Sequence, residues 1–153
     1  MRRYDLYIID DEVARDFFGK EPKLNQLFHA AFYEKQPEHR LQLERQVNYI
    51  TKTIPMFRLK TLLQRTLKDV TDYTVEANDW ELTLRSKDCK RVMRLQLDQK
   101  KCVLWSSGDL LTETLIFDRL REIDPYFLAV DRANERCGWL QPIKLVHRME
   151  GSS

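Results

Sequence analysis

The side chains with the most chemical potential in this sequence are its histidines and cysteines. No two histidines stand at the spacing of a metal-binding pair, and none lies beside a candidate nucleophile. The cysteines are odd in number, widely spaced and without a C-x-x-C pair, which fits neither a disulfide framework nor a zinc site. We therefore predict no metal site, free and partly buried thiols, and a structural role for His29 with a satisfied ring nitrogen. These residues are His29, His39, His147, Cys89, Cys102 and Cys137.

Asp10 and Asp11 are the adjacent carboxylates that would suit acid/base chemistry or metal binding. They stand where an apolar strand ends and a helix begins, and the first turn of a helix needs hydrogen-bond acceptors and negative charge. We interpret them as a helix cap. An enzyme centre assembled in space from Asp10, Cys102 or Cys137 with a histidine stays an open alternative.

Glycine is scarce, with four residues in the whole chain. A phosphate-binding loop or a dinucleotide fingerprint requires several glycines at fixed spacing, and neither pattern occurs. The sequence therefore lacks the glycine motifs that nucleotide-dependent enzymes use.

Positive charge is concentrated between Lys35 and Lys68, where eight Lys and Arg residues face two acidic ones. Tyr49 and Phe57 interrupt this run, and aromatic rings among cations suit single-stranded nucleic acid. The charges are spread over different helical angles, however, so we favour a solvated surface. Direct nucleic-acid binding by the 35–68 region is the alternative function.

Tyr49 is difficult to place in a core. At about 100° per residue, Leu43, Val47 and Ile50 form one apolar stripe, and Tyr49 lies about 130° away from it. Together with Gln42 and Gln46 it makes a neutral strip that is cheap to desolvate, as protein interfaces require.

The short helix after Asp10 poses the same difficulty. Val13 and Phe17 share one face and Ala14 and Phe18 another, and we expect one of these pairs to be exposed. Two such patches on separate helices suggest a groove for a protein partner.

Both helices and strands are predicted to position these residues. Residues 4–9 predict a strand near the middle of a sheet, because they become continuously apolar from Leu6. Helices are predicted from 10 to 18 with a left-handed cap at Gly19, from Pro22, from Pro37 to 51–54, and over 59–67.

The second half of the chain changes to a period of two. Alternation over 80–85 and 93–98, followed by 102–105, predicts an antiparallel meander. Residues 108–142 then indicate one unit: a helix with Leu111 on its apolar face that ends at Pro125, a strand, a turn and a second strand. We predict an α+β fold with helices packed on a mostly antiparallel β-sheet.

Length and composition favour one domain. With 153 residues, 42% hydrophobic and 33% charged, we assign residues 1–150 to a single domain and Gly151-Ser152-Ser153 to a tail. The sequence has neither a membrane-spanning run nor a signal-like apolar block near its start, so we expect a cytoplasmic protein without a membrane partner.

Several segments of the chain together carry a resemblance to a known family. They are Phe18-Gly19-Lys20-Glu21, Gln46-Val47-Asn48-Tyr49-Ile50-Thr51, Gly108-Asp109, Glu113-Thr114-Leu115-Ile116-Phe117, Phe127-Leu128-Ala129-Val130-Asp131 and Gly138-Trp139-Leu140-Gln141-Pro142. These segments resemble the SirA family, sporulation inhibitors of replication, and the resemblance is strongest between Gly108 and Pro142.

The resemblance implies a non-enzymatic regulator, with no catalytic residue, no cofactor and no small-molecule substrate. This regulator binds the N-terminal domain of the replication initiator DnaA and lowers initiation at sporulation. The resemblance also implies a partner-binding surface at Val13, Phe17, Gln46 and Tyr49, with Pro142 nearby. The family pattern has aromatic residues at both positions of the first helix, whereas this chain has Val13 at one of them.

Overall fold

The computed structural model describes residues 1–69 and 72–140, and these contain five helices and eight strands. In chain order they are β1 (Arg2–Ile9), α1 (Asp11–Asp16), α2 (Glu21–Tyr33), α3 (Pro37–Ile50), β2 (Thr51–Lys52), α4 (Met56–Lys68), β3 (Tyr73–Ala77), β4 (Glu81–Ser86), β5 (Val92–Leu97), β6 (Cys102–Ser106), α5 (Leu110–Ile123), β7 (Phe127–Asp131) and β8 (Arg136–Trp139). Among these helices none is long and apolar enough to span a membrane.

All the strands belong to one sheet, in the order β3-β4-β5-β6-β1-β7-β8, with β2 paired to the end of β1. Each pairing in the described sheet is antiparallel. Strand β1 lies in the middle, where Leu6 pairs with Cys102 on β6 and with Ala129 on β7. The predicted α+β class and the central position of residues 4–9 are confirmed.

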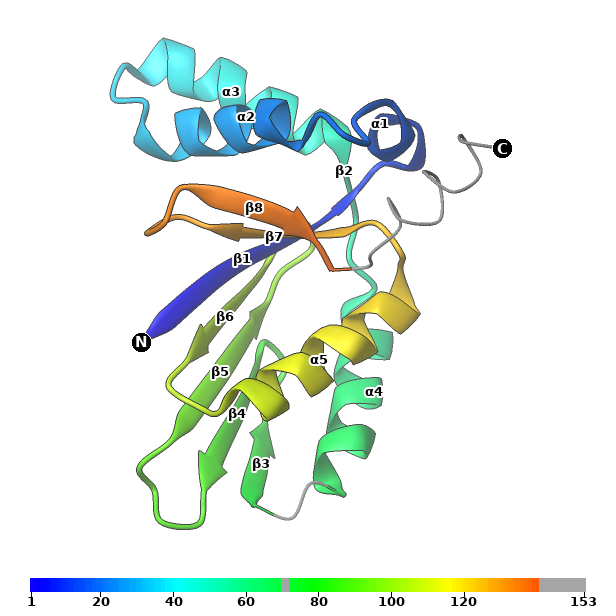
Figure 1. Ribbon diagram of the computed structural model, residues 1–153, viewed down its shortest axis with the longest axis vertical. Coiled ribbons are helices and arrows are strands. Elements are labelled where there is room, and N and C mark those ends of the chain that lie inside the picture. Colours follow the sequence, from blue (N-terminus) through cyan, green and yellow to red (C-terminus); the bar gives the residue numbers. More distant parts are fainter. Residues whose placement is uncertain (70–71, 141–153) are drawn as a thin grey trace.

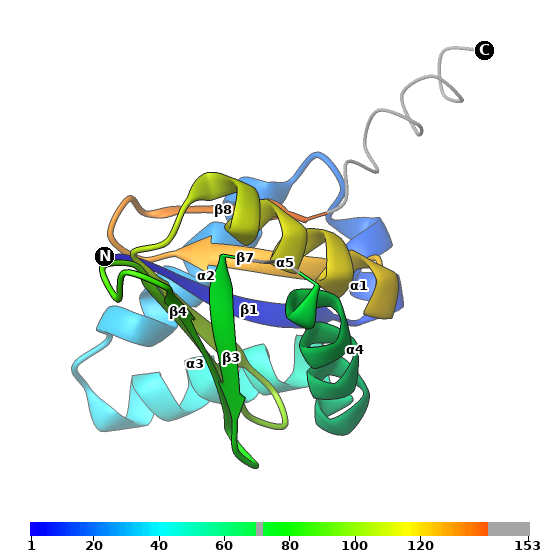
Figure 2. The same ribbon diagram turned by 90° about the horizontal axis from the view of Figure 1, so that it is seen from below.

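Helices cover both faces of the sheet, and β1 contributes side chains to each face. Leu6 and Ile8 join the cluster beneath α4 and α5, while Tyr7 and Ile9 join the cluster beneath α1, α2 and α3. Figure 1 shows the three N-terminal helices together over β1, β7 and β8, and Figure 2 shows α5 on the opposite side of these strands from α3. Burial on both sides explains the continuous apolar run in β1.

The predicted helix signals are present. The Asp10 carboxylate accepts hydrogen bonds from the amides of Glu12 (3.1 Å) and Val13 (3.4 Å), and Gly19 has a φ of +77°. Asp109 caps α5 by accepting from the Thr112 amide at 2.7 Å. The proline starts of α2 and α3 are also confirmed.

Some boundaries differ from the predictions. Helix α3 ends at Ile50 because the Thr51 hydroxyl donates to the Val47 carbonyl (2.9 Å) and Thr51 then pairs with β1 as strand β2. Helix α1 ends at Asp16 instead of Phe18. Strand β3 was not predicted, because its outward positions are polar and only Tyr73 is buried.

Leu111 does not belong to the apolar face of α5, since it is 84% exposed. The buried side of the first turn is taken by Thr112 and Glu113. Glu113 forms an ion pair with Arg2 and accepts from the Ser106 hydroxyl at 2.8 Å, and this contact turns the polar positions inward. A polar contact with a residue 111 positions away overrides the local hydrophobic pattern here.

Candidate partner-binding surface

Helix α1 lies against the sheet with Ala14 fully buried. Val13 and Phe17 are half-buried and pack at the edge of the cluster beneath α1–α3. Phe18 is also half-buried, with its ring 6.0 Å from that of Trp139 and 6.3 Å from that of Tyr126. The expectation that one pair on this helix is exposed is therefore wrong, because the β7–β8 hairpin covers the second face.

Helix α3 is a surface helix, and no residue in it is fully buried. Leu43, Val47 and Ile50 are half-buried on its inner side. Tyr49 is 84% exposed and Gln46 is also exposed, so the predicted position of this strip outside the core is confirmed. An aromatic ring with this exposure contributes little to the stability of the isolated fold.

The two helices meet at their ends. The backbone amide of Asp10, just before α1, donates to the carbonyl oxygen of Ile50, the last residue of α3, at 2.8 Å. Lys52, which follows α3, donates to Asp11 of α1 at 2.6 Å and pairs with Asp124 at 2.8 Å. These contacts hold the start of α1 next to the end of α3 at one corner of the protein (Figure 1). Val13 lies within α1 and Phe17 directly after it, and Gln46 and Tyr49 lie near the end of α3.

Lys52 is held by two carboxylates in a partly buried position. Burial by itself lowers the pKa of an ammonium group, but the hydrogen bonds to Asp11 and Asp124 outweigh it, and the pKa of Lys52 is raised. The lysine therefore stays charged and links α1 to the end of α5.

Comparison of the amino-acid sequence with known proteins identifies the family of this chain. The family model described as "Sporulation inhibitor of replication protein SirA" matches residues 2–144. The chain belongs to the SirA family. A relative with the same name from Bacillus subtilis (strain 168) is 33% identical over 146 residues, which cover 94% of this chain and 95% of the relative.

The SirA-family resemblance assigns partner contacts to five positions, and four of them lie on or directly after α1 and near the end of α3, the two elements that meet at this corner. Gln46 and Tyr49 present their side chains to solvent, whereas Val13 and Phe17 expose only part of theirs. Pro142 lies outside the described residues. We call the set Val13, Phe17, Gln46 and Tyr49 the α1–α3 surface.

The residues that could have formed a catalytic centre, Asp10, Asp11 and Cys102, have roles in the fold. Asp10 caps α1 and Asp11 pairs with Lys52, which confirms the structural interpretation of this carboxylate pair. Cys102 is fully buried, and burial raises its pKa to about 12. Across residues 1–69 and 72–140, no group of three potential metal ligands comes together.

His29 differs from its prediction. Both ring nitrogens are buried and neither has a hydrogen-bond partner within the described part of the chain. The imidazole instead stacks on Tyr33, with ring centroids 6.2 Å apart, and meets Phe32 edge-on at 5.9 Å. The residue therefore packs as an aromatic ring among the aromatic side chains of α2.

The basic run from Lys35 to Lys68 does not form one continuous face. Its cations lie partly on α3, which packs against one face of the sheet, and partly on α4, which packs against the other. Arg40 pairs with Glu44 within α3 at 3.8 Å. The sequence places these charges at different helical angles, and the fold divides them between two sides of the molecule.

Two contacts at this corner could not be predicted from the sequence. The bond from Asp10 to Ile50 joins backbone atoms forty residues apart, and Lys52 finds carboxylates on α1 and after α5. Both depend on β2 pairing with β1, and a two-residue strand is too short to be recognised from its periodicity.

Proposed function

We propose that this chain inhibits the initiation of chromosomal DNA replication during sporulation by binding the N-terminal domain of the initiator DnaA in the cytoplasm. Membership of the SirA family and the name of the Bacillus subtilis relative support the role in replication control. The observation that carries the binding site is the 84% exposure of Tyr49 at the corner where α3 meets α1.

The α1–α3 surface has the composition of an interface centre. Tyr49 offers a large ring whose apolar area is in water before binding, and the half-buried Val13 and Phe17 offer an apolar rim that is already held in position by the core. Gln46 lies one helical turn before Tyr49 and supplies a neutral hydrogen-bonding group. Aromatic anchors beside neutral polar groups are cheap to desolvate and dominate interface energies.

Inhibition of replication initiation then results from occupation of the DnaA domain by this chain. A protein that covers a small domain of DnaA blocks the productive assembly of the initiator or its recruitment of other factors. No catalytic step and no cofactor enter this mechanism.

The test is a titration of the isolated N-terminal domain of DnaA with the full chain. Tyr49→Ala is expected to weaken binding by at least about thirtyfold, the loss typical of an interface hot spot. Its free energy of unfolding should stay within about 0.5 kcal/mol of the wild type, because the side chain is exposed.

Phe57→Ala is the matched control, since Phe57 is an aromatic residue with 80% exposure on α4, away from the corner. It should bind DnaA like the wild type. Equal affinities for the Tyr49→Ala variant and the wild type would remove the site assignment, and no binding by the wild type would remove DnaA as the partner.

Binding to origin DNA by the purified chain alone, with an affinity that falls steeply as salt rises, would favour the alternative function. The distribution of the basic residues over two sides of the sheet argues against it.

A further inference from the structure

All the charged side chains of helix α4 are positive. The helix contains the cations Arg58, Lys60, Arg65 and Lys68 and no acidic residue. Within the described part of the chain none of these four forms an ion pair, whereas most arginines of the sheet and of α5 do. The inner side of α4 is apolar and fully buried through Leu59, Leu63 and Leu67. The cations therefore lie on a surface that nothing in the described fold neutralises.

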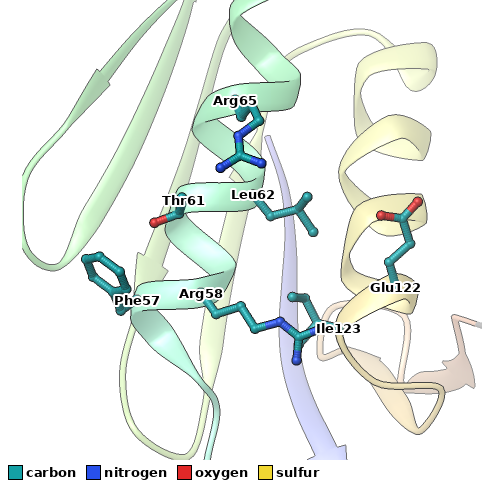
Figure 3. A pocket seen from close by; sticks show the side chains of 7 residues that line it. All are labelled: Phe57, Arg58, Thr61, Leu62, Arg65, Glu122 and Ile123. Atoms are coloured by element: carbon teal, nitrogen blue, oxygen red, sulfur yellow. The ribbon is translucent and has the colours of Figure 1, made fainter.

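A hollow of about 490 Å³ runs between this surface and the end of α5. Figure 3 shows Leu62 of α4 and Ile123 of α5 projecting toward each other, which gives the hollow an apolar floor. Arg58 and Arg65 stand on the α4 side, and Glu122 stands on the α5 side, where it pairs with Arg119 at 3.0 Å. We call this hollow the α4–α5 groove.

Arg58 and Arg65 are separated by seven residues of one helix. At 1.5 Å per residue their α-carbons are about 10.5 Å apart along the axis of α4, nearly two full turns. Carboxylates seven residues apart on a second helix have the same separation and face the same side. The two arginines of the groove therefore have the spacing needed to meet two carboxylates on one side of a second α-helix.

We propose that the α4–α5 groove binds an amphipathic helix of a partner protein whose apolar ridge lies on Leu62 and Ile123 and whose carboxylates, two turns apart, meet Arg58 and Arg65. Helices that lie in grooves between two other helices use this combination of an apolar ridge and charged flanks. The exposed ring of Phe57 lines the same hollow and adds apolar area at its outer edge.

The charges of the two walls favour a helix over a nucleic acid. Glu122 puts a carboxylate on the wall opposite the arginines, and a polynucleotide, which carries a phosphate at every step, would place negative charge beside it. A helix can carry carboxylates on one flank and uncharged residues on the other. The floor also offers aliphatic side chains, whereas single strands prefer a series of aromatic rings.

This groove and the α1–α3 surface lie on opposite faces of the sheet. The proposal is therefore independent of DnaA binding, and either can fail without the other.

The experiment uses the full chain and three defined fluorescent probes in an anisotropy titration. The first is an 18-residue helical peptide with a leucine ridge, glutamates seven residues apart on one flank and glutamines on the other. The second has lysines in place of the glutamates, and the third is a twelve-residue oligothymidylate. The test variant is Arg58→Glu with Arg65→Glu.

The matched control is Lys87→Glu with Lys90→Glu, which changes the net charge equally at two exposed lysines of the β4–β5 turn. We expect the acidic peptide to bind, the test variant to weaken it by at least about tenfold and the control to leave it within about twofold. Both variants should keep the thermal midpoint of the wild type, because all four side chains project into solvent or line an open hollow.

Any of the following results would overturn the proposal: no binding of the acidic peptide up to about 1 mM, equal weakening by the test and control variants, or tighter binding of the oligothymidylate than of the acidic peptide. The last result would assign the groove to a nucleic acid. Equal binding of the basic peptide would likewise exclude the charge complementarity on which the proposal rests.

Discussion

The backbone amide of Asp10 donates to the carbonyl oxygen of Ile50 at 2.8 Å. This bond joins the residue before α1 to the last residue of α3 and uses no side chain, so substitutions within the α1–α3 surface leave it in place. A loss of affinity in a variant of the exposed Gln46 or Tyr49 therefore reports a lost contact with the partner and not a displaced helix.

Val13 is a position of the α1–α3 surface where a substitution should raise the affinity for DnaA. The SirA-family resemblance places an aromatic residue here, and Val13 is only half-buried, so a ring has room to extend toward solvent. We expect Val13→Phe to tighten DnaA binding by about tenfold, since it adds apolar area worth about 1–2 kcal/mol on burial. Val75→Phe, a half-buried valine on strand β3, is the control. An unchanged or weaker affinity in the Val13→Phe variant would show that the partner does not use this position.

Phe17 should behave differently from Tyr49. From sequence alone we expect Phe17→Ala to leave the fold intact, but the ring packs against the cluster beneath α1–α3. Because the ring is half-buried, we expect the substitution to lower the free energy of unfolding by about 1–3 kcal/mol, less than for a fully buried phenylalanine. Urea denaturation measures this loss, and titration with DnaA measures the loss of affinity. A Phe17→Ala variant as stable as the wild type would contradict the packing described here.

Lys52 connects α1 to the end of α5 through Asp11 and Asp124. Because its pKa is raised, its ion pairs stabilise the protein fully below the unfolded-state pKa of about 10.4, and this contribution is lost as the pH rises through the higher folded-state pKa. We expect Lys52→Met to lower the free energy of unfolding by about 1 kcal/mol at pH 7, the upper range for pairs that are partly exposed. Lys87→Met, at an exposed lysine without an ion pair in the described chain, should cost nothing measurable. If the two variants differ as much at pH 12 as at pH 7, the ion pairs are not the cause.

Asp109 gives the opposite pH dependence. Burial raises the pKa of this carboxyl, but hydrogen bonds from the Thr112 amide (2.7 Å) and the Tyr73 hydroxyl (2.7 Å), together with Arg91, lower it below its usual value. Its contribution is therefore present above the unfolded-state pKa of about 3.9 and is lost as the pH falls through the lower folded-state value.

Asp109→Asn keeps an N-cap but removes the charge, whereas Asp109→Ala removes both and should cost about 1–2 kcal/mol at pH 7. We expect the stability difference between the wild type and Asp109→Asn to shrink between pH 5 and pH 2 in urea denaturation. A difference that grows on acidification would reverse the assigned direction of the pKa.

Much of this fold is encoded locally. The proline starts of α2 and α3, the Asp10 cap and the period-two segments of β4 and β5 are each determined by neighbouring residues, and all of them were predicted. The exposure of Tyr49 was also predicted, because a helical angle follows from sequence position alone.

The errors arise where distant residues decide the outcome. The burial of Glu113 depends on Arg2, the end of α3 depends on the pairing of Thr51 with Ile9, and the covering of Phe18 depends on Trp139. None of these partners lies within one helical turn or one strand of the residue it contacts. The α4–α5 groove escaped prediction for the same reason, since Leu62 and Ile123 meet only after the sheet has formed.

Asp5 provides the last prediction. It is fully buried in the central strand and serves three cations: Arg3 (2.9 Å), Arg132 (2.8 Å) and Lys101 (3.6 Å). Arg132 also places its guanidinium carbon 3.6 Å from the ring centroid of Phe32 on α2. Asp5→Asn removes the one anion that all three cations share, so we expect a loss of about 2–3 kcal/mol, less than for a fully buried pair because the cations reach water.

Arg132→Met should cost less, about 1 kcal/mol, because Asp5 keeps Arg3 and Lys101 as partners and the methionine still packs on Phe32. Urea denaturation of the two variants and of their combination tests this order. The double variant should lose less unfolding free energy than the sum of the two single losses. In the described chain Arg132 pairs with Asp5, so this pair is already lost once Asp5 is neutral. Additive costs, or a larger loss for Arg132→Met than for Asp5→Asn, would show that the cluster is not held by the shared carboxylate.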